Sequence, residues 1–307
     1  MNSKTVNIIL DDSKQMLVYH HSGKDKGLIK KFNMPQTVDH AFYMEKLGIM
    51  VSLYMNKINL IKGASVIKAF DEAFYNKYPQ TIRVRDKSLC YKQTKDSLVY
   101  FQELKFMKKF QQEHHTINIG VKGAINDHQI MKEGLVAVIG QEGFVGLFNA
   151  FENRLVCELD WISPGSLSNL AVKPDDTMMV VAGRSLSDCK NWLGLIQITL
   201  PKDVKGKKRP QNPQLKLLDV YEASNIKSPF RGLNFEFKVN KSVLLMTSTE
   251  RAPHQLLLFG VFGSKLYLVK KVKANFNYSY QLISNSENSK VITGSYSNIL
   301  SIFSISI

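Results

Sequence analysis

The sequence predicts an all-β protein, and more specifically a single β-propeller. Short apolar runs rich in Val, Ile, Leu and Phe alternate with turn signals along the whole chain, as in antiparallel strands joined by hairpins. Between residues 123 and 160, four such runs follow one another within about 40 residues, which is the content of one propeller blade. At about 40–45 residues per blade, a chain of 307 residues corresponds to roughly seven blades.

The unit at 123–160 shows the pattern most clearly because its turns are the shortest. INDHQIM is followed by a turn at 132–133, LVAVIG by one at 141–143 and FVGLFNA by one at 152–153, and RLVCEL closes the unit. Connections this short join antiparallel neighbours. We therefore expect one four-stranded sheet here and similar sheets elsewhere.

Three units precede it. The first contains TVNIIL, QMLVYHH and LIKKFNM, and the second contains VDHAFYM, GIMVSLY, INLIK and SVIKAF. The third contains TIRVRDK, SLCYKQ, SLVYFQE and LKFMKKF, with an uncertainty of one strand in where it ends. Residues 71–78 fit either a loop or a single helical turn.

Three further units follow. SLSNLAVKPDDTMMVVAG forms a hairpin around Pro174, Asp175 and Asp176, which are turn-forming residues, and LGLIQITL and LKLLDVYEA complete that unit. The next contains RGLNFEFKV, SVLLMTST, LLLFGVF and LYLVKKVKA, and the last contains YSYQLIS, KVITGSY and ILSIFSISI. Because the last unit has only three runs, we expect the N-terminal TVNIIL to complete it, which removes an open sheet edge.

The pattern resembles the WD40-repeat family over essentially the whole chain. The best matches are residues 136–158, 170–183 and 282–304, where an apolar strand leads to small residues and then a turn. Phe148-Asn149 and Phe303-Ser304 stand where the family usually has Trp-Asp. No Trp-Asp or Gly-His dipeptide occurs, so the resemblance is to a degenerate member. It implies one domain over 1–307 with seven four-stranded blades closed by the terminal strands. A six-bladed ring or another propeller class is the alternative.

Composition narrows the cellular setting. Three widely spaced cysteines without a CxxC pair support neither a disulfide framework nor a zinc site, and Cys157 is expected to be buried in a strand. The N-terminal residues lack the apolar core of a signal peptide, and the longest apolar run, near 255–262, is far below the ~18 residues that span a bilayer. We expect an intracellular protein of the cytoplasm or cytoskeleton, with the nucleus as an alternative.

Several motifs share features with known chemical sites. GQEGFVG at 140–146 has the spacing of a phosphate loop, yet the strand-like FVGLFNA follows it instead of a helix, so a hairpin turn is expected. His114, His115 and His128 lack a partner at metal-ligand spacing and are expected at the surface or in turns. SPFRG at 228–232 resembles the Phe-Arg-Arg-Gly motif of phosphoinositide-binding propellers but has a single arginine, so a turn entering a strand is expected. No catalytic residue, cofactor, metal ion or small-molecule substrate is expected.

The most distinctive surface feature is a basic insertion at 201–214, PKDVKGKKRPQNPQ. Its cations are Lys202, Lys205, Lys207, Lys208 and Arg209. Weaker clusters are Lys105, Lys108 and Lys109, and Lys270, Lys271 and Lys273. Together with the net charge of +15, the insertion favours an anionic partner.

The favoured function is a non-enzymatic protein-interaction scaffold, a subunit of a larger intracellular assembly, with an acidic protein surface such as that of the cytoskeleton as partner. One alternative is an RNA-associated propeller of a ribonucleoprotein complex that uses the 202–209 loop. Further alternatives are a phosphoinositide-binding propeller and a propeller hydrolase.

Overall fold

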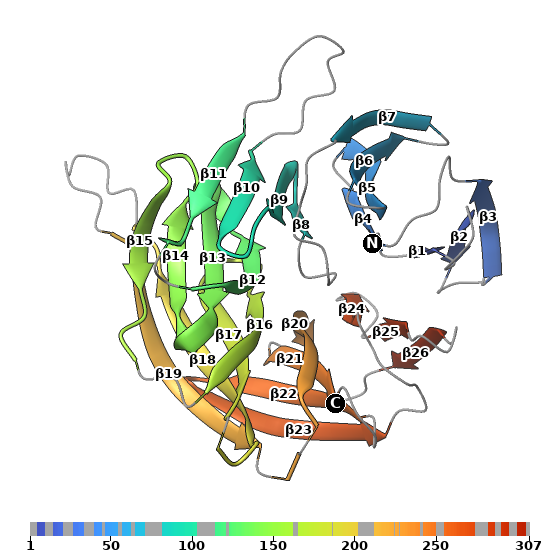
Figure 1. Ribbon diagram of the computed structural model, residues 1–307. Helices are drawn as coiled ribbons and strands as arrows, with labels where there is room; N and C mark the ends of the chain where they lie inside the picture. The colour runs from blue at the N-terminus through green and yellow to red at the C-terminus, as the bar shows by residue number, and fades with distance from the viewer. Residues whose placement is uncertain are drawn as a thin grey trace. The chain divides into compact units, whose positions relative to one another are not determined.

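The computed structural model describes residues 5–9, 15–20, 27–33, 40–44, 47–54, 57–62, 65–70, 82–102, 114–120, 123–161, 165–185, 187–201, 212–223, 225–226, 228–239, 242–249, 255–273, 282–285, 290–294 and 300–304. Their strands form seven antiparallel sheets, five of four strands and two of three (Figure 1). The chain divides into two compact units, Met1–Asn118 and Ile119–Ile307.

The first unit contains three sheets. One is made of β1 (Thr5–Ile9), β2 (Gln15–His20) and β3 (Gly27–Asn33), and the second of β4 (His40–Met44), β5 (Ile49–Tyr54), β6 (Lys57–Lys62) and β7 (Ser65–Phe70). The third contains β8 (Ile82–Arg85), β9 (Ser88–Lys92), β10 (Ser97–Phe101) and β11 (His115–Asn118). Apolar side chains of the second and third sheets share one core, which includes Val51, Leu60, Tyr91 and Phe101.

The second unit contains four sheets. They are β12 (Ile125–Ile130), β13 (Leu135–Gly140), β14 (Val145–Asn149) and β15 (Arg154–Glu158); β16 (Ser166–Val172), β17 (Met178–Arg184), β18 (Asn191–Thr199) and β19 (Gln214–Ala223); β20 (Phe230–Val239), β21 (Ser242–Thr249), β22 (Gln255–Phe262) and β23 (Lys265–Lys273); and β24 (Leu282–Asn285), β25 (Lys290–Gly294) and β26 (Leu300–Ser304). Short 3-10 turns join β12 to β13 (Lys132–Gly134) and β13 to β14 (Gln141–Gly143).

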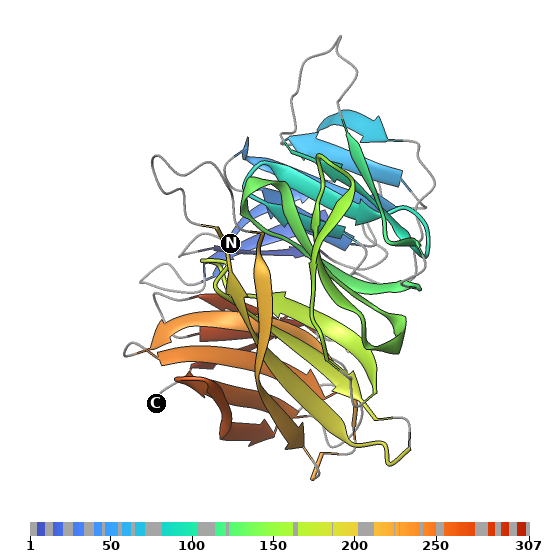
Figure 2. The ribbon, with the colours of Figure 1, turned by 90° about the vertical axis from the view of Figure 1, so that its left-hand side faces the viewer.

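Consecutive sheets of the second unit stack strand on strand. The first strands β12, β16, β20 and β24 lie next to one another, and so do the fourth strands β15, β19 and β23. Figures 1 and 2 show the yellow-green sheet of β16–β19 beside the orange sheet of β20–β23. Two cores fill the spaces between sheets, one centred on Leu147, Val181 and Trp192 and one on Leu193, Leu257 and Phe259. Because both faces of a middle strand are covered, β13 is buried at all six positions.

The predicted strands agree with those observed to within a few residues at each end. One exception is the sheet that begins at β8, whose fourth strand is His115–Asn118, a run that the sequence did not mark as a strand. The run LKFMKKF proposed for that place and the undecided segment 71–78 lie outside the described residues.

The N-terminal strand that was expected to close the ring belongs to the first unit. TVNIIL forms β1, which pairs antiparallel with β2. Closure by the terminal strands joins sheets of two different units, so it stays a prediction, as do the count of seven four-stranded blades and the single domain over 1–307. None of the helical turns in the described part of the chain has the length or hydrophobicity of a bilayer-spanning helix.

Candidate interaction surface

Three aspartates bind backbone groups of a neighbouring sheet. Asp127, on β12, is 1% exposed, and its carboxylate accepts hydrogen bonds from the N–H of His128 at 2.8 Å and from that of Leu170, on β16, at 2.9 Å. Asp176 accepts from the N–H of Lys132 at 3.0 Å. Because a carboxylate buried without donors is costly, these contacts tie the sheets of the second unit together.

Asp219 makes the corresponding contact one sheet further along. Its carboxylate, on β19, accepts from the N–H of Leu266, on β23, at 2.8 Å. Sequence reasoning missed all three aspartates as links. Asp127 and Asp176 are buried and Asp219 is half-buried, and each lies in or next to an apolar run, which is the only local signal of its position.

An amide fixes the segment that enters β20. The buried Asn191 donates from Nδ2 to the carbonyl oxygens of Ile226 and of Ser228, the latter at 2.8 Å. Phe230, the first residue of β20, is 2% exposed and belongs to the core. The prediction that SPFRG is a turn entering a strand is confirmed.

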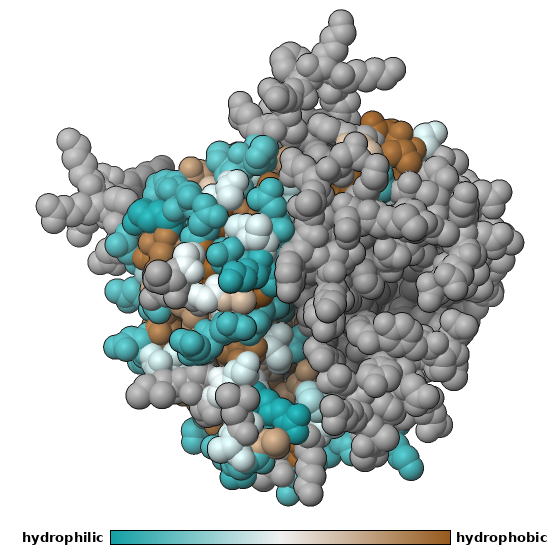
Figure 3. Space-filling model, viewed as in Figure 1, coloured by the Kyte–Doolittle hydropathy of each residue, from teal (hydrophilic) through white to brown (hydrophobic). Residues whose placement is uncertain are grey.

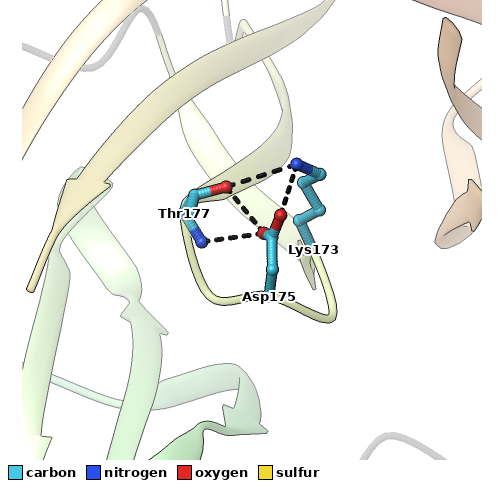
Figure 4. A network of polar contacts seen from close by, with 3 residues as sticks. All are labelled: Lys173, Asp175 and Thr177. Atoms are coloured by element: carbon cyan, nitrogen blue, oxygen red, sulfur yellow. Dashed lines mark hydrogen bonds and ion pairs between the residues drawn. The ribbon is translucent and has the colours of Figure 1, made fainter. Parts of the chain in front are cut away.

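The hairpin between β16 and β17 closes with a polar network at its tip (Figure 4). Asp175 accepts from Lys173 Nζ at 2.6 Å, from the N–H of Thr177 at 3.1 Å and from its hydroxyl at 2.6 Å. Partial burial by itself raises the pKa of Asp175, yet the hydrogen bonds from Lys173 and Thr177 outweigh it and hold the pKa below its usual value. The prediction of a turn at Pro174–Asp176 is confirmed, and the network is a turn clamp.

The glycines at 140–146 also form a turn, as predicted. Gln141–Gly143 is a short 3-10 turn between β13 and β14, and Gly143 has φ 83°. The prediction that the histidines lie at the surface or in turns is wrong for His128, which is fully buried in β12 because both faces of that strand are covered. His114 is exposed and His115 is half-buried in β11. No group of three His, Cys, Asp or Glu side chains within the described ranges could hold a metal ion.

The cysteines differ from expectation in which one is buried. Cys157 is only half-buried, in the outer strand β15, whereas Cys90 is fully buried in β9 and Cys189 is exposed. Burial raises the pKa of the Cys90 thiol strongly, against a smaller lowering by Arg83. Cys90 is therefore an inert packing group.

The basic insertion is not part of the described structure. Lys202, Lys205, Lys207, Lys208 and Arg209 lie outside the described residues, as does the cluster Lys105, Lys108 and Lys109. The third cluster is described. Lys270, Lys271 and Lys273 are exposed on β23, the outer strand of its sheet.

The same hairpin carries the two most exposed aromatic side chains of the described residues. Phe262 is 52% exposed, Tyr267 49% and Val269 41%, and the two rings lie 5.9 Å apart. Residues opposite one another in an antiparallel pair project from the same face. Phe262 pairs with Lys265 and Gly260 with Tyr267, so the aromatic rings and Lys265 share one face.

A bulge and a glycine complete this face. The register shifts between Leu258 and Phe259, and Val269 is the extra residue on β23. A Cβ on Gly260 would lie 2.5 Å from the Phe262 ring and 3.1 Å from Val269 Cγ2, so both side chains lie over the bare glycine backbone. Lys270, opposite Leu258, follows on the same face. We call Phe262, Lys265, Tyr267, Val269 and Lys270 the β22–β23 patch.

Other exposed apolar residues lie on other outer strands or in turns, as does Phe151, 39% exposed, between β14 and β15. Val66 and Ile67, on β7, are 38% and 41% exposed, and brown hydrophobic atoms reach the surface over β7 in Figure 3. This strand carries no exposed aromatic ring among the residues whose burial is described. Among the described residues, the β22–β23 patch is where two exposed rings lie together with lysines.

Several solved structures share this fold. The β-propeller domain of Cps50 (Swd1) from Myceliophteria thermophila superposes with a TM-score of 0.71 at 9% identity, covering 99% of this chain and 94% of that one. A chain of the mitotic checkpoint complex gives 0.67 at 8% identity, with 98% and 86% covered. The WD40 β-propeller domain of Doa1 gives 0.67 at 11% identity, with 98% and 89% covered.

Comparison by sequence finds no such relatives. No protein-family model matches the chain, and no curated protein matches it. The structural likeness nevertheless confirms the predicted fold, because the whole chain aligns. The protein is an all-β, WD40-like β-propeller.

Proposed function

We propose that this protein is a non-enzymatic interaction subunit that binds other proteins within a larger intracellular assembly. The observation that carries the proposal is the β22–β23 patch, where rings that could have been buried are left half exposed beside lysines. Solvent-exposed aromatic residues on a rigid strand are typical of protein contact sites. One structurally similar chain is part of the mitotic checkpoint complex, which is consistent with such a role.

The rigid frame supports the same proposal. Asp127, Asp176 and Asp219, together with the buried Asn191, hold successive sheets together through backbone groups. Side chains on the outer strands are therefore presented in fixed positions. A preorganised surface loses little conformational entropy on binding. Such a frame suits recognition of a partner.

Purification of the tagged protein under native conditions, followed by mass spectrometry, tests this function. We expect defined proteins to co-purify in fixed ratios with the tagged chain. A strictly monomeric protein without any stoichiometric partner contradicts the proposal. If the partner is an acidic filament such as those of the cytoskeleton, we further expect the protein to sediment with that filament and to be released by salt.

The net charge of +15 supports an RNA-associated propeller as the second candidate. In that case, affinity for RNA falls steeply with salt and drops when Lys205, Lys207, Lys208 and Arg209 are changed to Glu. Filter binding measures both effects. The absence of RNA retention at low salt rules this candidate out.

A further inference from the structure

We propose that the β22–β23 patch binds an acidic peptide segment in which Asp or Glu residues flank an aromatic or aliphatic side chain. The inference rests on the proposed function and names the surface and the chemistry of the partner. Its evidence is the combination of charge, exposed rings and limited area on one face of the hairpin.

The charge of this hairpin has one sign. Residues 255–273 contain four lysines, Lys265, Lys270, Lys271 and Lys273, and no Asp or Glu. Among the described residues, none of these lysines forms an ion pair. The carboxylate of Asp219, on the neighbouring strand β19, binds the backbone N–H of Leu266. Because the exposed lysines have no acidic neighbour on their own hairpin, a partner that supplies carboxylates is favoured.

The lysines alone have a simpler explanation, since charged residues on an outer strand prevent edge-to-edge aggregation. That explanation does not cover the rings. Phe262 and Tyr267 are each about half exposed. Large exposed aromatic side chains promote aggregation, which is the opposite of the effect of the lysines. Their retention beside Lys265 and Lys270 points to an apolar contact framed by ion pairs.

The size of the patch selects among occupants. An aromatic side chain buries about 150–250 Å² when fully covered, so each half-exposed ring offers on the order of 100 Å². A stable dimer or domain interface needs about 800 Å² from each partner. The patch is therefore too small for a second copy of this chain and suits a short segment that places one side chain on the rings.

Two pairs of variants distinguish binding at the patch from a general effect of exposed apolar or charged side chains. Phe262→Ser with Tyr267→Ser removes the rings, and Ile67→Ser on β7 is the control for an exposed apolar residue elsewhere. Lys265→Glu with Lys270→Glu reverses two charges on the patch face. Lys271→Glu with Lys273→Glu makes the same change on the same strand outside the patch, since Lys271 lies opposite Leu257 and Lys273 opposite Gln255, on the other face.

The full chain is panned with a phage-displayed library of random dodecapeptides, and peptides that also bind the Phe262→Ser, Tyr267→Ser variant are removed. We expect the remaining peptides to be rich in Asp and Glu around an apolar residue. In fluorescence anisotropy, their affinity falls about tenfold or more for the ring variant and for Lys265→Glu, Lys270→Glu, and less for the two controls. The charge variant keeps the test valid if the ring variant misfolds.

Several outcomes overturn the proposal. They are the absence of peptides that discriminate against the variants, enrichment of neutral or basic peptides, and equal loss in the Lys271→Glu, Lys273→Glu control. Flotation with phosphatidylserine-containing vesicles that is lost in the ring variant assigns the patch to lipid instead, and patch-dependent dimers in sedimentation assign it to a second copy. Stoichiometric partners that stay bound to both patch variants refute this surface and leave the proposed function standing.

Discussion

The sheets β16–β19 and β20–β23 have the same four-stranded topology and differ in their outer strands. On β19, charges of both signs occur, Lys216 with Asp219 and Glu222, and Asp219 binds the next sheet. On β23, four lysines stand without an acid, beside two half-exposed rings. The first sheet uses its polar groups within the fold, whereas the second leaves its groups available. The difference separates the frame of this protein from its candidate contact surface.

The largest effect should come from breaking the frame at Trp192. This side chain is 1% exposed and packs edge-on against Trp161 at 5.4 Å between ring centroids. Trp192→Ala should cost about 3–5 kcal/mol of unfolding free energy, measured by urea denaturation. Tyr267→Ala, at a ring that is 49% exposed, is the matched control and should cost less than about 1 kcal/mol. If both variants lose the same free energy of unfolding, Tyr267 stabilises the fold as much as the buried core does and is not a free contact surface.

A smaller loss is expected where two sheets are linked through Asp127. Asp127→Ala leaves the N–H of Leu170, on the neighbouring sheet, without its acceptor, and the loss of this link should cost about 1–3 kcal/mol. Asp127→Asn keeps one acceptor oxygen and should lose less. In urea denaturation, the free energy of unfolding should be lowest for Asp127→Ala, intermediate for Asp127→Asn and highest for the wild type. An Asp127→Ala variant as stable as the wild type contradicts the linking role.

The smallest effect concerns the turn clamp of β16–β17. Because the pKa of Asp175 is lowered in the folded protein, the carboxylate stabilises the fold above the unfolded pKa of about 4, and this contribution is lost as pH falls through the folded pKa. The group is largely exposed, so the gain should be only a few tenths of a kcal/mol. Stability curves of the wild type and Asp175→Ala should differ at pH 7 and converge at low pH. A constant difference across this range excludes the charge as the cause.

Much of the fold follows from local pattern. Runs such as LVAVIG and SVLLMTST alternate with turn residues, and hairpin registers depend on neighbours in sequence, so strand positions could be predicted from one chain. The candidate surface could not be predicted in this way. In the sequence, Lys270, Lys271 and Lys273 form only a weak basic cluster. Phe262 and Tyr267 have the pattern of ordinary residues in apolar strands, and nothing local indicates that they are exposed.

The sequence by itself determined the all-β class, the four-strand units and the basic charge. The first two depend on short apolar runs separated by turn residues, and the charge depends on composition alone. Only the tertiary structure decided which residues are covered. Asp127 is buried because β16 lies against β12, and His128 because both faces of β12 are covered. Phe262 and Tyr267 stay about half exposed on the β22–β23 hairpin, where Phe262 and Val269 lie over the bare backbone of Gly260. Exposure depends on the sheet that packs against a strand, and that neighbour lies about 40 residues away in the chain.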